Sequence, residues 1–133
     1  MELSFKINKS PEFIFDYLTD MQKFVSVHPV ITKIELLENN KYLVHETLKF
    51  GFLPISFTYY VTIESNLDEK IVIIRATVMK FTKIEMNFKL KTDQEFCIVE
   101  EKIQFKSPLP IKRIMQNIFR KQHTLLFQNI EKV

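Results

Sequence analysis

The hydrophobic and polar positions of this chain follow two different periods, and the change lies near residue 107. Before it, apolar and polar side chains alternate in short runs, which is the period of half-buried strands. After it, apolar side chains recur every three or four positions, which is the period of an amphipathic helix. Residues 110–133 are therefore predicted to form one helix with an apolar stripe of Ile111, Ile114, Met115, Ile118, Phe119, Leu125, Leu126, Ile130 and Val133.

Seven alternating runs predict seven strands. They are residues 1–7, 30–38, 42–50, 55–64, 70–80, 84–91 and 95–106. Asn39 and Asn40 mark one hairpin, because asparagine tolerates the left-handed conformation that a tight turn requires. Residues 51–54 mark the next reversal. The reversal near Phe81 is poorly marked, since it contains neither glycine nor proline.

Two short helices are expected between the first and second strands. Ser10 supplies an N-cap hydroxyl and Pro11 a residue suited to the first helical position. Asp20 is expected to cap the second helix, which Pro29 ends because the residue before a proline disfavours helical geometry. This pair of helices is expected to form a corner of the fold and to leave the core to the sheet and the long helix.

The order of strand, two short helices, six strands and one long helix resembles the helix-grip fold of the START-like superfamily (SRPBCC). That superfamily includes polyketide cyclase-like proteins, lipid-transfer domains and pollen-allergen-like plant proteins. The resemblance covers the whole chain, and the stretch Ser10-Pro11-Glu12-Phe13-Ile14-Phe15-Asp16-Tyr17-Leu18-Thr19-Asp20 looks like the start of such domains. It implies an α+β fold, with a curved antiparallel sheet of about seven strands around a long C-terminal helix, and a single domain over residues 1–133.

Composition excludes several classes of function. A net charge of +3 without a basic stripe does not favour nucleic-acid binding. The single glycine, Gly51, excludes glycine-rich phosphate loops, and no residue pair has the spacing of a zinc site. We expect no cofactor and no metal. The lone Cys97 fits a reducing compartment, and no apolar run approaches the ~18 residues of a membrane span, so a cytoplasmic protein is expected.

Successive side chains of a strand point to opposite faces, so parity separates an inner face from an outer one. Phe50 falls on the inner face, and Arg75 is placed on the outer face. A groove between the inner face and the long helix is the expected ligand site. Its predicted lining residues are Val44, Glu46, Phe57, Tyr59, Val61, Met86, Phe88, Glu101, Met115, Ile118, Gln122 and Leu126.

Polar residues interrupt both apolar surfaces. Glu46 and Glu101 fall on the inner face, where burial would raise a carboxyl pKa and make the group a polar anchor or a general acid. A strand end or bulge that turns each acid to solvent is the alternative. Gln122 and Asn129 interrupt the helix stripe. They face either a water- or ligand-filled cavity or ordinary hydrogen-bond partners on the sheet.

The other candidate residues are expected to be structural. His28, His45 and His123 are too far apart for a metal site and are expected to be solvated or to cap. His123 falls at the edge of the stripe, and Phe127 among the outer residues of the helix. Basic residues of the helix could meet an acidic partner or lipid headgroups, or serve only solubility. They are Lys112, Arg113, Arg120 and Lys121.

Three functions follow from these patterns. The first is binding of a hydrophobic small molecule, such as a lipid, isoprenoid or polyketide, in the apolar groove. The second, which the resemblance allows, is a cyclase or dehydratase that uses Glu46, Glu101 or Tyr59 as acid or base. The third is a protein-interaction module that uses the basic helix. No transmembrane segment is expected, and peripheral membrane contact is compatible with the sequence.

Overall fold

The computed structural model describes residues 1–133, except for the side chain of Phe50, so the inward orientation expected for that residue lies outside the described part. The fold is α+β helix-grip, as predicted. Its elements are β1 (Glu2–Ile7), α1 (Pro11–Thr19), α2 (Met21–Val27), β2 (Ile31–Glu38), β3 (Lys41–Phe50), β4 (Leu53–Asn66), β5 (Ile71–Val78), β6 (Thr82–Asp93), β7 (Phe96–Lys106) and α3 (Lys112–Glu131).

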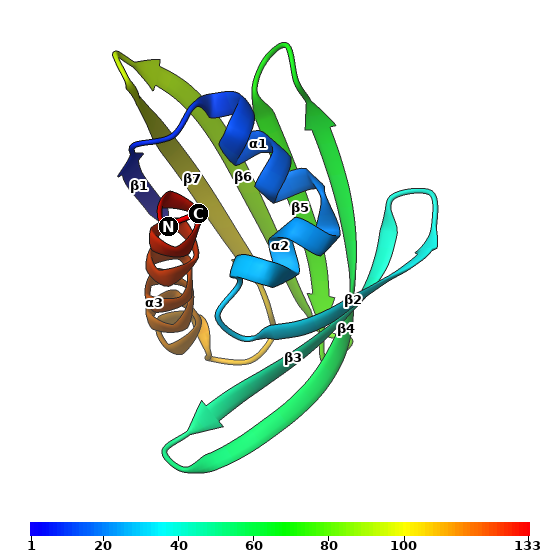
Figure 1. Ribbon diagram of the computed structural model, residues 1–133. Coiled ribbons are helices and arrows are strands. Elements are labelled where there is room, and N and C mark those ends of the chain that lie inside the picture. The colour runs from blue at the N-terminus through cyan, green and yellow to red at the C-terminus, as the bar shows by residue number, and fades with distance from the viewer.

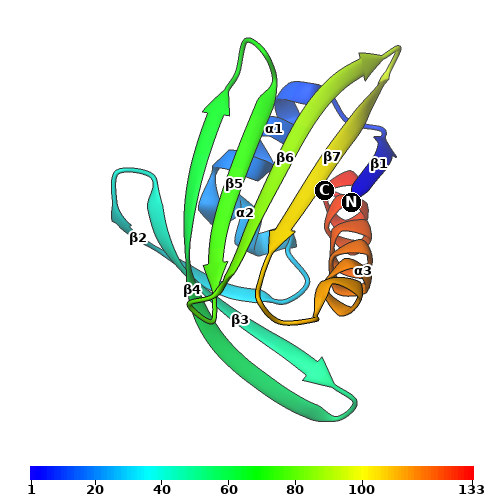
Figure 2. The ribbon, with the colours of Figure 1, turned by 180° about the vertical axis from the view of Figure 1, so that it is seen from behind.

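The seven strands form one antiparallel sheet in the order β1-β7-β6-β5-β4-β3-β2. Five hairpins join β2 to β7 in sequence, and β1 returns to pair with β7. The sheet is curved, and all three helices lie on its concave face (Figure 1). From behind, the strands stand in front of the helices (Figure 2), so the convex face has no helical cover. A site enclosed by sheet and helices can therefore form on one face.

The capping residues predicted from sequence make the expected contacts. Ser10 Oγ accepts a hydrogen bond from the N–H of Phe13, and Pro11 begins α1. The Asp20 carboxylate accepts from the N–H groups of the first turn of α2, which ends before His28. These contacts satisfy N–H groups that the helices cannot pair internally, and they fix α2 beside the concave face.

Left-handed residues form the turns. Asn39 and Asn40 have φ of 21° and 61°, and Gly51 has φ of 66°, as the turn signals predicted. The poorly marked reversal uses Met79 and Lys80, whose φ values are 53° and 64°. A residue with a Cβ rarely adopts this conformation without an evident signal, which explains why the boundary was hard to place from sequence.

The rotation of α3 differs from the predicted stripe. Phe127, expected on the outer side, is 0% exposed and stacks on Phe5 with ring centroids 4.7 Å apart. His123, expected at the edge, is 3% exposed. Leu125 and Ile114 of the predicted stripe are 39% and 58% exposed. Apolar residues occur around much of this helix, so their spacing alone did not determine which of them meet the core.

Candidate ligand-binding cavity

A cavity of about 390 Å³ lies between the concave face of the sheet, α2 and α3. Side chains from β2 to β6 form one wall, and α2 and α3 form the other. Of the lining residues, six carry a side-chain polar atom, and the rest are aliphatic, Met or Phe. The six are His28, Tyr42, Glu46, Tyr59, Gln122 and His123. Such a volume and lining are typical of small-molecule sites.

Ten of the twelve predicted lining residues lie on the wall of this cavity. They are Val44, Glu46, Phe57, Tyr59, Val61, Met86, Phe88, Met115, Ile118 and Gln122. Strand parity located the sheet residues, because each has the side-chain direction that alternation requires. Their role in binding a ligand stays a prediction.

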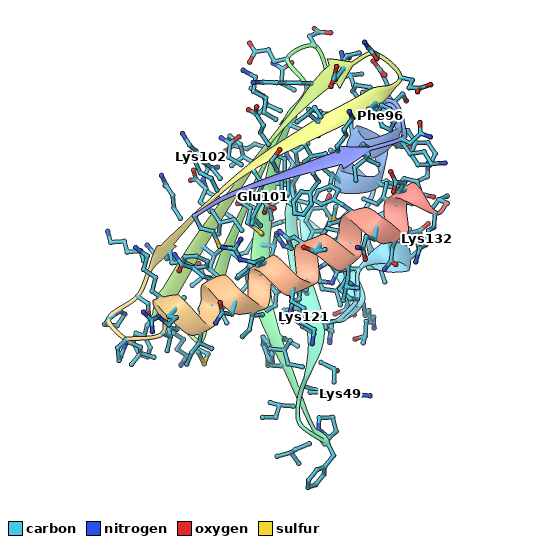
Figure 3. All side chains as sticks on the ribbon, turned by 90° about the vertical axis from the view of Figure 1, so that its left-hand side faces the viewer. Lys49, Phe96, Glu101, Lys102, Lys121 and Lys132 are labelled. Carbon is cyan, nitrogen blue, oxygen red and sulfur yellow. The ribbon has the colours of Figure 1, made fainter. Side chains whose placement is uncertain are left out.

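Glu101 and Leu126 do not lie on the wall, which corrects the prediction for both. Each is fully buried. The helix rotation places Leu126 in the core, and it brings His123 to the wall in front of Glu101. Figure 3 shows Glu101 between the sheet and α3. The acid thus belongs to the support of the cavity.

Glu46 and Tyr59 form a hydrogen-bonded pair on adjacent strands. The Tyr59 hydroxyl donates to Glu46 Oε1 at 2.8 Å. Burial raises the pKa of Glu46, and the hydrogen bond from Tyr59 offsets part of that rise. Burial, followed by the nearby Glu46 charge, raises the pKa of Tyr59 well above its ordinary value. Glu46 therefore turns inward, as one of the two sequence interpretations expected, and its protonated form is favoured.

His28 is held as a neutral hydrogen-bond donor. Its Nδ1 accepts hydrogen bonds from the N–H groups of Val30 at 3.2 Å and Ile31 at 3.1 Å. An Nδ1 that accepts places the ring proton on Nε2. Burial, followed by the nearby His123, lowers the pKa of His28 to about 3. A lining histidine with a fixed Nε2–H can donate to a carbonyl or hydroxyl oxygen of a ligand.

His123 and Glu101 form a buried pair between α3 and β7. His123 Nδ1 lies 2.7 Å from Glu101 Oε1, with which it makes a hydrogen bond. Oε2 also lies 2.7 Å from Nδ1 but lacks hydrogen-bond geometry, and it has no other partner among the described residues. Because Glu101 occupies Nδ1, the Nε2 of His123 is the ring nitrogen left for a ligand.

The two amides of the helix stripe have different environments. Asn129 Nδ2 donates to the carbonyl of Val27 at 2.9 Å, so it joins α3 to α2 and does not line the cavity. Gln122 is buried on the wall and has no side-chain hydrogen bond among the described residues. The ordinary structural interpretation thus holds for Asn129, and Gln122 is available to a ligand.

Sequence reasoning missed two cavity residues, His28 and His123. The pattern Phe119, Gln122, His123, Leu126 contained a signal for His123, since positions three and four apart share a helix face. His28 gave no such signal, because it follows a short helix at a corner. By contrast, the predicted outward position of Arg75 is confirmed, and its guanidinium pairs with Glu64 and Glu85 across neighbouring strands.

No group of three or more potential metal-ligating side chains gathers within the described part of the chain. No helix there is both long and apolar enough to cross a bilayer. The cavity can therefore be assessed from its own side chains. It can enclose an apolar body and offer hydrogen bonds from Glu46, His28, Gln122 and His123.

A family model for a carbon monoxide dehydrogenase component, CoxG, matches residues 4–131. This covers nearly the whole chain. A sequence search of curated proteins gives no match.

Solved structures share the fold at low sequence identity. A START superfamily protein from Mycobacterium smegmatis has a TM-score of 0.75 and 14% identity, over 99% of this chain and 97% of that one. The Zhui aromatase/cyclase from Streptomyces sp. R1128 has a TM-score of 0.70 and 9% identity, over 99% and 90%. The di-domain aromatase/cyclase BexL from the BE-7585A biosynthetic pathway has a TM-score of 0.83 and 10% identity, over 98% of this chain and 46% of that one.

Proposed function

Because this chain belongs to the carbon monoxide dehydrogenase CoxG family, within the START-like, polyketide cyclase-like superfamily, we propose that it binds a hydrophobic small molecule between its sheet and α3. The cavity of about 390 Å³ carries this proposal. Its walls are almost entirely aliphatic and aromatic, so an apolar ligand gains the free energy of leaving water without loss of polar contacts. A lipid, isoprenoid or polyketide-like molecule fits this chemistry.

The six polar residues on the wall narrow the ligand class. A purely hydrocarbon ligand would leave the Nε2–H of His28 and the amide of Gln122 without hydrogen bonds. A ligand with an uncharged oxygen, such as a ketone or alcohol, would satisfy them. A carboxylate is less suited, since Glu46 on the same wall would repel it once ionised. The proposed ligand is thus a largely apolar molecule with a neutral oxygen.

Native mass spectrometry of freshly purified protein tests this function. We expect a bound mass in the range of a small lipid, which is lost after extraction with organic solvent. The extracted protein should then take up an apolar fluorescent probe, and the recovered ligand should displace it. Absence of both a bound mass and probe uptake would refute the proposal.

A second candidate is proton-transfer catalysis on the bound molecule. It is favoured by the raised pKa of Glu46, which lies on the wall with Tyr59 and His123. The aromatase/cyclase neighbours are consistent with it. Incubation of the recovered ligand with wild-type and Glu46→Gln protein separates the two functions. Product that forms only with wild type supports catalysis, and an unchanged ligand with both supports binding alone.

A further inference from the structure

The cavity opens where lining side chains are also exposed to solvent. Ile55 at the start of β4, Met79 in the β5–β6 turn and Ile114 in the first turn of α3 line the cavity and are all exposed. The lining residues His123 and Phe88 are buried. The mouth therefore lies between the β3–β4 hairpin, the β5–β6 turn and the beginning of α3. These segments lie at the lower end of Figure 1, where the β3–β4 hairpin projects beyond the other elements.

Large apolar side chains surround this mouth. Phe52, at the tip of the β3–β4 hairpin, is 97% exposed, and Leu53 beside it is also exposed. Phe81 and Leu109 are exposed in the β5–β6 turn and before α3. Scattered apolar residues are normal on a protein surface, but a contiguous group around a cavity opening marks a contact site. We call residues 48–56, 78–83 and 106–117 the mouth surface.

The charges of the mouth surface all have one sign. It contains six cationic residues and no Asp or Glu, although the chain has 16 acidic residues. The cations are Lys49, Lys80, Lys83, Lys106, Lys112 and Arg113. None of them forms an ion pair with a described residue. Lys49 lies on the hairpin that extends past α3 (Figure 3). A partner that neutralises this surface must be negatively charged.

We propose that the mouth surface docks on an anionic lipid bilayer, so that the cavity opens toward the membrane. Apolar residues at protruding tips can enter the boundary between headgroups and acyl chains, while the surrounding lysines contact lipid phosphates. The segregated positive charge provides complementarity to an anionic leaflet. The tips belong to three separate loops around an opening, an arrangement that fits a fluid surface. Docking follows from this surface and does not depend on the identity of the cavity ligand.

Vesicle binding by the full chain tests the docking. We expect the protein to sediment with vesicles of phosphatidylcholine and phosphatidylglycerol and to remain in solution with phosphatidylcholine alone. Raising the salt to about 1 M, where the Debye length is about 3 Å, should release it. Equal binding to both vesicle types, or no binding to either, would overturn the proposal. The second outcome would leave ligand binding in the cavity untouched, so the two proposals fail separately.

Single-tryptophan variants test the orientation, since the chain contains no tryptophan. Phe52→Trp places a reporter at the mouth, and Leu67→Trp places one at the exposed β4–β5 turn, at the opposite end of the sheet. We expect a blue shift of emission on anionic vesicles for the first variant only. A shift at position 67, or none at position 52, would overturn the orientation. Both positions are exposed, so folding should be unaffected.

Substitutions that remove one contribution at a time complete the test. Phe52→Ser should weaken vesicle binding about tenfold, because it removes a phenyl group from the apolar boundary. Lys49→Glu should weaken it by at least about fivefold. The matched controls Leu67→Ser and Lys89→Glu, at exposed positions away from the mouth, should bind as wild type does. Losses in the controls equal to those at the mouth would refute a specific docking surface.

Discussion

The Nδ1 of His123 lies 2.7 Å from the carboxylate of Glu101, and both side chains are almost completely removed from solvent. Their elements, α3 and β7, are joined by the chain only through the loop before α3. The hydrogen bond therefore fixes both the rotation of the helix and the position of the imidazole on the cavity wall. One polar contact thus links the packing of the fold to the geometry of the proposed ligand site.

Separating this pair should be costly, and replacing it as a whole should not. We expect Glu101→Leu or His123→Leu alone to lower the free energy of unfolding by about 3–5 kcal/mol, because the remaining polar group stays buried without a partner. The double variant should recover most of that loss, since two apolar residues satisfy each other. Urea denaturation of the four proteins measures the coupling. Additive losses in the double variant would show that the pair does not act as a unit.

Glu46 should make the native state less stable as the pH rises. Burial raises its folded pKa above the ordinary value of 4.5, so the native protein binds more protons than the unfolded chain between those two values. Stability from this group is complete below pH 4.5 and is lost as the pH rises through the folded pKa. Glu46→Gln should remove this loss. Urea denaturation from pH 4 to pH 8 tests it, and Glu38→Gln, an exposed position, should leave the profile unchanged.

His28 should have the opposite dependence on pH. Its folded pKa of about 3 lies below the ordinary value of 6.5, so the unfolded chain binds more protons between these values. Its contribution to stability is present above pH 6.5 and is lost as the pH falls toward 3. His28→Asn keeps an acceptor for the N–H groups of Val30 and Ile31, and it should flatten this acid limb. A limb as steep as that of wild type would refute the assignment to His28.

The sequence predicted the strands, the helix caps and the inward faces because these depend on local rules. Period-two alternation determined the direction of Glu46 and Val61, and the Ser10 hydroxyl needed only a backbone N–H three residues away. The pairing of Glu101 with His123 depends on how α3 is rotated against the sheet. That rotation is decided by contacts such as Phe127 on Phe5, which lie far apart in sequence. Local spacing contains no information on it.

The helix rotation can be tested by comparing Phe127→Ala with Leu125→Ala. Phe127 is fully buried between Phe5 and Phe88, so its truncation should lower the free energy of unfolding by about 3–5 kcal/mol. Leu125 is partly exposed and should cost about 1 kcal/mol or less, since it opens little cavity volume. Denaturation by urea distinguishes the two. A larger loss for Leu125 would favour the stripe that spacing alone predicts.

Filling the cavity should remove ligand binding without unfolding the protein. Val61 lies on the cavity wall, so the ring of Val61→Phe can occupy empty volume. Val99 is fully buried away from the wall, and Val99→Phe should cost about 1–3 kcal/mol by overpacking. We therefore expect Val61→Phe to keep near wild-type stability and to lose the bound mass in native mass spectrometry. Thr62→Phe, on the exposed side of the same strand, should keep both. A ligand that stays bound to stable Val61→Phe protein would place the binding site outside this cavity.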